Sequence, residues 1–206
     1  MANGRHRRSI EERRAEKGAV DDPEIVLQAA ARFLEARPRS VAEVRRRLGR
    51  AGYRSGLIQG AITRLTELGM LDDAVFAAQW VESRDRAHPR GEAALMMELR
   101  QLGIDAQTIA ATLRARRDAA ATWDGATPRG GDALAPTTVG PPPNADAIAA
   151  QKVLARHART LDRIADPRLR RQRAYALLAR NGFDPETCRD AAATIGRDES
   201  GTADSG

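Results

Sequence analysis

The sequence predicts an all-α protein of three tandem three-helix repeats that form an elongated, solenoid-like body. An apolar pattern around a glycine occurs three times, with members at −8, −4, +1, +6 and +10 from that glycine. Every periodic segment follows the 3.6-residue helical period and none alternates as a strand does. A unit this small has to bury its apolar face against a neighbour. The three sets are Val44, Leu48, Gly52, Tyr53, Ile58, Ile62; Leu95, Leu99, Gly103, Ile104, Ile109, Leu113; and Ala174, Leu178, Gly182, Phe183, Cys188, Ala192.

The first repeat, residues 23–71, is expected to hold three helices. Residues 24–36 place an apolar stripe on one face, and Pro38 prevents that helix from continuing. Ser40 and Glu43 then have the spacing of a capping box, which predicts a helix over 41–51. Gly52 ends this helix, because glycine adopts the left-handed conformation without strain. The stripes are Val26, Ala29, Ala30, Phe33 and Leu34; Val41, Val44, Leu48 and Ala51; and, over 55–69, Ile58, Ala61, Ile62, Leu65 and Leu68.

The second repeat, residues 72–120, follows the same plan. Asp72 or Asp73 caps a helix that carries Phe76, Ala77 and Trp80. His88-Pro89 breaks that helix, and two more are expected near 91–102 and 106–117, the latter capped by Asp105.

The third repeat, residues 145–196, is separated from the second by an insertion. The second glycine follows the first after 51 residues, but the third follows the second only after 79. Residues 121–144 account for the excess, being rich in Gly, Pro and Thr and without hydrophobic periodicity, which predicts a flexible linker. Beyond it, helices are expected near 145–160, from Asp166-Pro167 to Asn181, and after Asp184-Pro185. Trp123 is the linker's one large apolar residue and a candidate docking point.

Composition narrows the class of protein. The chain has 206 residues, a net charge of +6 and 42% apolar residues. It contains no apolar run long enough to span a bilayer, and its charged N-terminus does not resemble a signal peptide. One cysteine cannot form a disulfide framework. We therefore expect a cytoplasmic protein with disordered ends at 1–22 and 197–206.

The sequence contains no recognisable catalytic or cofactor-binding constellation. The three histidines lie far apart and none has metal-ligand spacing with Cys188, which occupies the core slot of Ile58 and Ile109. Nucleotide-cradling glycine loops are absent. The Asp72-Asp73 pair is a possible metal ligand, but its position at a helix start favours capping. The chain is predicted not to be an enzyme and to need no cofactor or metal.

Arginines gather on the middle helices of two repeats. In the first they lie opposite the apolar stripe, with Glu43 as the one acid nearby, whereas the middle helix of the second is nearly neutral. Such basic ridges suit a phosphate backbone or an acidic protein groove. The other interpretation is that these arginines only keep an alanine-rich helix soluble. Because the aromatic residues are expected in core positions, any contact with nucleic acid should be electrostatic and independent of sequence.

Several motifs resemble the RecX family. Arg37-Pro38-Arg39-Ser40 followed by Glu43, Val44, Leu48 and Gly52-Tyr53 is similar to its first repeat. Leu68-Gly69-Met70-Leu71-Asp72-Asp73 with Phe76-Ala77 resembles its most recognisable motif, and Arg90-Gly91, Leu99, Gly103-Ile104 its second repeat. Tyr175, Leu178 and Gly182-Phe183 are similar to its third. The resemblance covers about 25–117 and 145–195, and departs from the family at the 121–145 insertion and at Val44 and Ala174, where bulkier residues are commoner.

The resemblance implies a regulator of the recombinase RecA that lodges in the groove of the RecA nucleoprotein filament and inhibits strand exchange and ATP hydrolysis. A monomer that meets the filament, and single- or double-stranded DNA through phosphates, is expected. The alternatives are an autonomous DNA-binding helical module, since helix, glycine turn and helix also describe a helix-turn-helix, and an inert scaffold. The predicted contact residues are Arg39, Arg45, Arg46, Arg47, Arg50, Arg54, Arg168, Arg170, Arg171 and Arg173.

Overall fold

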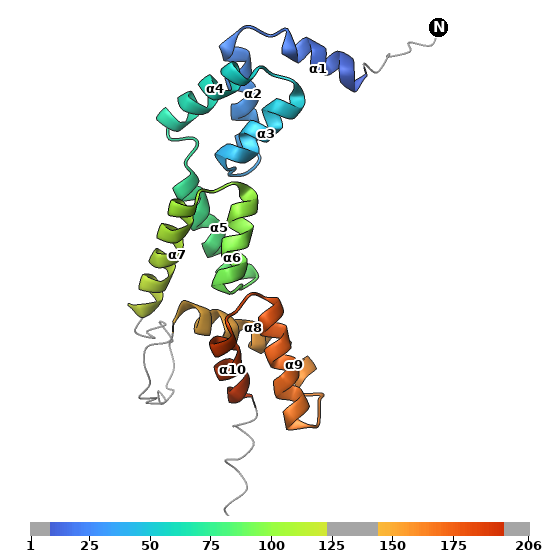
Figure 1. Ribbon diagram of the computed structural model, residues 1–206, viewed down its shortest axis with the longest axis vertical. Coiled ribbons are helices and arrows are strands. Elements are labelled where there is room, and N and C mark those ends of the chain that lie inside the picture. The colour runs from blue at the N-terminus through green and yellow to red at the C-terminus, as the bar shows by residue number, and fades with distance from the viewer. Residues whose placement is uncertain (1–8, 123–143, 196–206) are drawn as a thin grey trace, which may run out of the picture. The chain divides into compact units, whose positions relative to one another are not determined.

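A computed structural model describes residues 9–122 and 144–195. Within these ranges the chain forms ten helices and no strand, which confirms the all-α prediction (Figure 1). Nine helices match the predicted ones, with ends that differ by a few residues. The helices are α1 (Ile10–Gly18), α2 (Pro23–Glu35), α3 (Val41–Ala51), α4 (Ser55–Glu67), α5 (Asp73–Ala87), α6 (Glu92–Leu102), α7 (Ala106–Ala121), α8 (Ala145–Leu161), α9 (Pro167–Arg180) and α10 (Pro185–Thr194).

The prediction that residues 1–22 are disordered is wrong for α1. Ser9 and Glu12 form a capping box, in which the Ser9 hydroxyl accepts from the Glu12 N–H and the Glu12 carboxylate accepts from the Ser9 N–H. The helix also meets the α3–α4 corner, where Arg54 Nε donates to the Gly18 carbonyl at 3.0 Å. Tertiary contact therefore adds to local capping in a segment whose composition alone suggested disorder.

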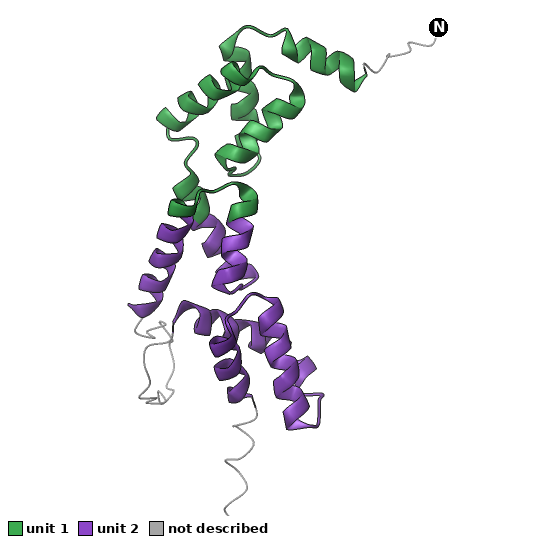
Figure 2. Ribbon diagram, viewed as in Figure 1, with its two compact units in different colours: residues 1–77, 100–108 green, residues 78–99, 109–206 purple. Residues whose placement is uncertain are grey.

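The chain divides into two compact units (Figure 2). Unit 1 comprises residues 1–77 and 100–108, and unit 2 comprises residues 78–99 and 109–206. The division passes through α5, α6 and α7 and so differs from the predicted boundaries of the repeats. The three-repeat partition stays a prediction. The predicted linker lies outside the described residues except at its ends, as do Trp123 and the predicted tail at 197–206.

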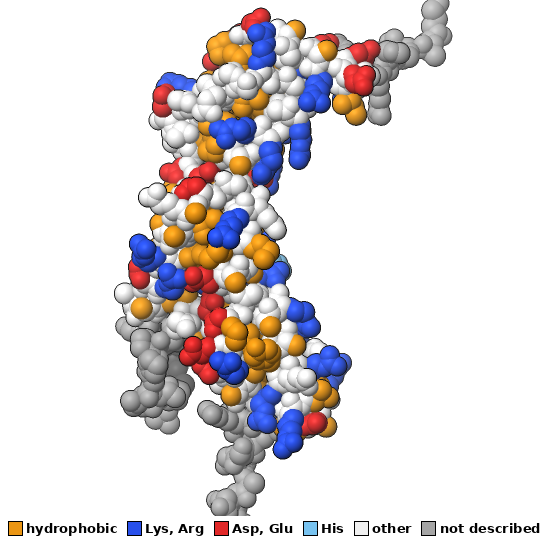
Figure 3. Space-filling view, viewed as in Figure 1, with side chains coloured by type: hydrophobic (Ala, Val, Ile, Leu, Met, Phe, Trp, Pro, Cys, Tyr) orange, Lys and Arg blue, Asp and Glu red, His pale blue; other side chains and the backbone are white. Residues whose placement is uncertain are grey.

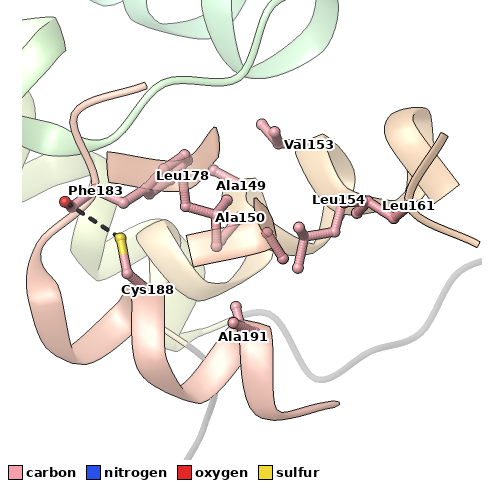
Figure 4. Packing of buried hydrophobic residues seen from close by; sticks show 11 residues of the cluster. Ala149, Ala150, Val153, Leu154, Leu161, Leu178, Phe183, Cys188 and Ala191 are labelled. Atoms are coloured by element: carbon pink, nitrogen blue, oxygen red, sulfur yellow. Dashed lines mark hydrogen bonds between the residues drawn. The ribbon is translucent and has the colours of Figure 1, made fainter. Parts of the chain in front are cut away.

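The apolar register forms the core in all three helix triplets. Each of its fifteen non-glycine members is buried, and Gly52, Gly103 and Gly182 have φ of 103°, 86° and 82°. Around α2–α4 these residues pack with Val26, Ala30 and Leu65. The side chains of α8–α10 form a second cluster, in which the Cys188 thiol points at the Phe183 carbonyl (Figure 4). The register therefore marks the residues that pack in the core of each triplet, as the sequence suggested.

Within unit 1, the start of α3 meets the second helix triplet in a defined joint. The N–H of Val41, the first residue of α3, donates to Asp73 Oδ1 at 2.9 Å. The Ser40 hydroxyl donates to the Leu102 carbonyl at 2.7 Å. A side chain at Gly103 would lie in the space that α3 occupies. Burial raises the pKa of Asp73, and the bond from Val41 only partly opposes this.

Within unit 2, the start of α6 meets the third triplet in the same manner. The N–H of Glu92, the first residue of α6, donates to Asp146 Oδ2 at 3.0 Å. The Gly91 N–H donates to the Asn181 carbonyl at 3.0 Å. Val41 and Glu92 both stand eleven residues before their own glycine, so equivalent positions make equivalent contacts. The helices on the two sides of the undescribed segment 123–143 are therefore joined.

A buried arginine crosses this second joint. Arg116 Nε and Nη2 donate to the two carboxylate oxygens of Asp85, each at 2.9 Å, and Nη1 donates to Asp146 Oδ1 at 2.6 Å. The Arg116 side chain is only 6% exposed. Burial by itself lowers the pKa of Arg116, but the two ion pairs more than offset this and raise it.

Candidate functional site

The helix α3 presents the basic surface predicted from the sequence. The Ser40–Glu43 capping box fixes its first turn, since the Ser40 hydroxyl accepts from the Glu43 N–H at 3.1 Å. Val44 and Leu48 point into the core, which leaves the opposite face to arginines. Arg45, Arg46, Arg47 and Arg50 are all exposed there. Figure 3 shows Lys and Arg side chains over the part of the chain that contains α2–α4, and others over α9.

These arginines differ in their partners. Glu43 accepts from Arg37 at 2.7 Å and lies 3.5 Å from Arg39, so its negative charge is already compensated. Arg45 donates to the neutral Gln59 at 2.9 Å. Among the described residues, no carboxylate forms an ion pair with Arg46, Arg47 or Arg50. We call these three residues the α3 arginine patch.

A hollow of about 450 Å³ lies beside this patch, lined by Phe33, Glu43, Arg46, Arg47 and Arg50. Phe33 was expected in the core but is only half-buried. Its ring centre lies 4.3 Å from the Arg39 guanidinium carbon and 5.7 Å from that of Arg47. Attraction between a guanidinium and an aromatic face holds such side chains in place. The one aromatic residue of the hollow thus orients part of its positive charge.

Two predicted contact residues of unit 1 have structural partners. Arg39 stacks on Phe33 and pairs with Glu43, and its side chain is only 16% exposed. Arg54 precedes α4, donates to the Gly18 carbonyl and pairs with Asp21. Both guanidiniums are engaged with neighbouring segments of their own chain. These contacts give Arg39 and Arg54 a role in packing, and the contact role that the sequence assigned to them stays a prediction.

The ion pairs of Glu43 make the stability of unit 1 depend on pH. Burial alone would raise the pKa of Glu43, but the hydrogen bonds from Arg37 and the Ser40 N–H outweigh it and lower the pKa below its ordinary value of 4.5. The ionised form is favoured in the folded state. Its stabilisation is therefore fully present above the unfolded pKa and is lost as the pH falls through the folded pKa.

Replacing Glu43 by glutamine should lower the free energy of unfolding by about 1 kcal/mol at pH 7, because the charged hydrogen bonds are lost. At pH 3 the difference from the unchanged protein should be smaller, since the stabilisation by the Glu43 carboxylate is lost as the pH falls through its lowered folded pKa. Urea unfolding followed by circular dichroism at both pH values measures this. Glu12→Gln, the same change in the exposed capping box of α1, is the control; an equal loss there would contradict the role given to the Arg37 pair.

The second predicted ridge, on α9, is only partly available. Arg168, Arg171 and Arg173 are exposed, but Arg170 is 8% exposed and its Nε donates to the Ile164 carbonyl at 3.0 Å. A side chain held in this way stabilises the α8–α9 turn. Arg170 was predicted to be a contact residue but is buried, because at this position the arginine folds back over its own loop; its contact role stays a prediction.

The two basic clusters are not copies of each other. Counted from the glycine of each triplet, the α3 arginine patch occupies positions −6, −5 and −2, in the last turns of the helix. The exposed arginines of α9 stand at −14, −11 and −9, in its first turns. In α6 the slots of the patch hold Met97, Glu98 and Gln101. Positive charge is therefore not a property of the repeat itself.

The middle triplet uses its equivalent slots for internal pairing. Glu98, in the slot of Arg47, accepts from Trp80 Nε1 at 2.9 Å and from Arg84 Nε at 2.7 Å. Arg84 stands nineteen residues before its glycine, as Phe33 does in the first triplet. The same pair of positions thus holds an ion pair in one triplet and an aromatic–arginine contact in the other. This agrees with the predicted near-neutrality of the second middle helix.

The acidic pair Asp72-Asp73 caps helices, as predicted, but two different ones. Asp72 accepts from the N–H groups of Ala74 and Val75 at the start of α5, whereas Asp73 caps α3. In the described ranges, no group of three or more His, Cys, Asp or Glu side chains could hold a metal ion.

Cys188 is fully buried and burial raises the pKa of its thiol, which suits a core residue better than a nucleophile.

None of the helices described is both long and apolar enough to cross a membrane.

Sequence reasoning missed Asp85, Arg116 and Asp146, whose pairing joins α5, α7 and α8. No spacing rule connects these residues, because they lie about thirty positions apart in the chain.

The family models and the curated relatives that this chain matches all carry the name RecX. Residues 27–65 match the family model described as "RecX, first three-helix domain", and residues 72–113 match "RecX, second three-helix domain". The chain is 40% identical over 82 residues to the regulatory protein RecX of Mycolicibacterium smegmatis and 43% identical over 99 residues to that of Mycobacterium avium. These matches cover 40% and 46% of this chain, and 44% and 57% of the relatives. The chain thus aligns with about half the length of these relatives.

Two crystal structures share the fold. That of RecX from Lactobacillus salivarius has a TM-score of 0.61 and covers 85% of this chain and 97% of its own. Another, of a regulatory protein RecX, has a TM-score of 0.58 and covers 86% of this chain and 70% of its own. Both are 17% identical to this chain, so their similarity concerns the fold alone.

Proposed function

The chain belongs to the RecX family, and from that premise we propose that it regulates the recombinase RecA by binding in the groove of the RecA nucleoprotein filament. In this proposal it inhibits strand exchange and ATP hydrolysis without catalysing a reaction of its own. It acts in the cytoplasm, where RecA and its DNA are found, in recombination, DNA repair and the SOS response.

One observation carries the proposal beyond the family. The α3 arginine patch, Arg46, Arg47 and Arg50, is exposed and has no ion pair among the described residues. Positive charge that a fold leaves unpaired is available to a polyanionic partner, and a RecA filament contains the phosphates of its DNA. We propose as the contact set the predicted arginines that are exposed and form no ion pair among the described residues, which are Arg45, Arg46, Arg47, Arg50, Arg168, Arg171 and Arg173.

Replacing Arg45, Arg46 and Arg47 together by alanine tests this function. The protein concentration that half-inhibits RecA ATPase on single-stranded DNA should rise at least about tenfold, since about 1.4 kcal/mol of binding free energy corresponds to that factor. Circular dichroism confirms that the variant is folded. If inhibition by the folded variant is unchanged, the contact surface lies elsewhere; if the unchanged protein has no effect on RecA, the proposed function fails.

The competing functions predict different results in the same material. An autonomous DNA-binding module would bind a particular duplex sequence without RecA, using polar side chains of α4 or α7. An inert scaffold would bind neither RecA filaments nor DNA in a salt-dependent manner. Co-sedimentation with RecA filaments at two salt concentrations separates both from the filament-binding regulator.

A further inference from the structure

The α3 arginine patch is not required by the fold. The register keeps Val44 and Leu48 in α3 and Leu95 and Leu99 in α6, and all four are buried. The patch slots of α6 nevertheless contain a methionine, a glutamate and a glutamine. A helix of this kind therefore folds without three arginines at these positions. The apolar register therefore does not account for the three arginines of α3.

The hollow beside the patch has the charge of an anion site. Three guanidiniums that form no ion pair within residues 9–122 and 144–195 line it, and the carboxylate in its lining, Glu43, is compensated by Arg37 and Arg39. Positions 46, 47 and 50 lie within little more than one helical turn, a rise of about 6 Å. The three charges are thus concentrated in a small area that a short stretch of one strand can cover.

An aromatic side chain completes the site. Phe33 comes from α2, lines the hollow and lies 5.7 Å from the Arg47 guanidinium. Grooves that track a single strand combine positive charge with aromatic residues. An acidic protein surface would need only the positive charge to bind here. The aromatic side chain therefore favours a nucleic acid as the ligand.

On this basis we infer that the hollow lined by Phe33, Arg46, Arg47 and Arg50 binds the phosphodiester backbone of single-stranded DNA. Arg46, Arg47 and Arg50 contact phosphate oxygens, and Phe33 is a positioning residue that orients Arg47. The inference rests on the proposed function, because it assigns to the DNA of the filament, rather than to RecA itself, the contact made by this surface.

The test measures DNA binding in the absence of RecA, by fluorescence anisotropy of a labelled oligothymidine at several salt concentrations. The variant Arg46→Ala, Arg47→Ala, Arg50→Ala should bind at least about tenfold more weakly near 0.1 M salt. The slope of log affinity against log salt should decrease by about 2, since each phosphate contact on a single strand contributes about 0.7. Phe33→Leu should weaken binding a few-fold and Phe33→Tyr should restore it, which a merely structural role in the core would not require.

A matched control separates the site from net charge. Replacing Arg64, Arg86 and Arg100 by alanine removes the same number of positive charges, but at exposed positions outside the hollow. Arg64 and Arg86 pair with Glu67 and Glu82 on their own helices. This variant should retain the affinity and the salt slope of the unchanged protein to within about twofold.

Three outcomes would overturn the inference. One is a patch variant that binds oligothymidine as the control variant does, and another is a loss confined to duplex DNA of the same length. The third is an unchanged protein that binds no DNA but inhibits RecA ATPase in a manner that needs the patch, which would indicate a contact with acidic RecA residues. In that case the proposed function stands and only the ligand is wrong. DNA binding through the patch without any effect on RecA would instead support the site and contradict the function.

Discussion

Replacing Arg116 by alanine is expected to lower the free energy of unfolding by about 3–5 kcal/mol, because it removes one partner of a buried set of ion pairs. Its guanidinium forms a two-bond pair with Asp85 and a third bond with Asp146, and donates to the Arg90 carbonyl at 3.3 Å. The Asp146 side chain is 14% exposed and has one oxygen already used by the Glu92 N–H. Without Arg116, two carboxylates remain close to the joint with their charge uncompensated.

Hydrogen exchange read by mass spectrometry locates the loss. Peptides from α8–α10 should lose protection, and peptides from α2–α4, which have a separate core, should retain it. The matched control is Arg117→Ala: this neighbouring side chain is 50% exposed and pairs with Glu92 at 2.5 Å, so its loss should cost less than about 1 kcal/mol.

A double-mutant cycle makes the test specific. Asp85→Ala alone and together with Arg116→Ala gives the coupling between the two side chains, which should exceed about 1 kcal/mol if the pair contributes as argued. Equal effects of Arg116→Ala and Arg117→Ala would contradict the central position of Arg116 in the joint.

The scaffold was predictable because its signals are local. Burial of residues such as Leu48, Leu99 and Leu178 follows from a fixed distance to a glycine, and that distance is set by helix geometry alone. Helix starts at Ser40 and Asp184 follow from side chains that accept N–H bonds two or three residues later. Information of this kind is contained within a dozen neighbouring residues.

The charged residues were harder to assign, because their roles depend on distant neighbours. Arg46 and Arg170 both lie in arginine-rich middle helices. Arg46 is exposed, whereas Arg170 donates to the carbonyl of Ile164 in the preceding loop. Arginine is usually exposed, which made a contact role for Arg170 the natural expectation. Arg116 departs from this general tendency, because the fold brings Asp85 and Asp146 to its guanidinium.

The joints show a related limit of sequence reasoning. Asp73 caps α3 and Asp146 caps α6, so two equivalent contacts use aspartates at different distances from their own glycines. The two aspartates make the same contact in space, but they do not occupy the same position in the apolar register. A periodic pattern in the chain therefore reveals the core of each triplet and not the contacts that join one triplet to the next.

The joint in unit 2 also makes Gly91→Ala a severe change, expected to cost about 3 kcal/mol from overpacking together with a lost hydrogen bond. A Cβ at this position would lie 2.1 Å from the Gly182 carbonyl oxygen and 2.4 Å from the Phe183 nitrogen. Both are backbone atoms, so no side-chain rotation relieves the collision. The α9–α10 corner has to move away, which also lengthens the 3.0 Å bond from the Gly91 N–H to Asn181.

Gly60→Ala provides the opposite result in the same protein. Gly60 lies inside α4 with nothing within 4 Å of its added Cβ, so alanine should stabilise the chain by up to about 1 kcal/mol through helix propensity. Thermal unfolding followed by circular dichroism compares the two variants, and hydrogen exchange should show the loss at Gly91 spreading through α8–α10. If Gly91→Ala unfolds at the temperature of the unchanged protein, the close approach of these two backbone segments is wrong, and with it the assignment of α6 and α9 to one joint.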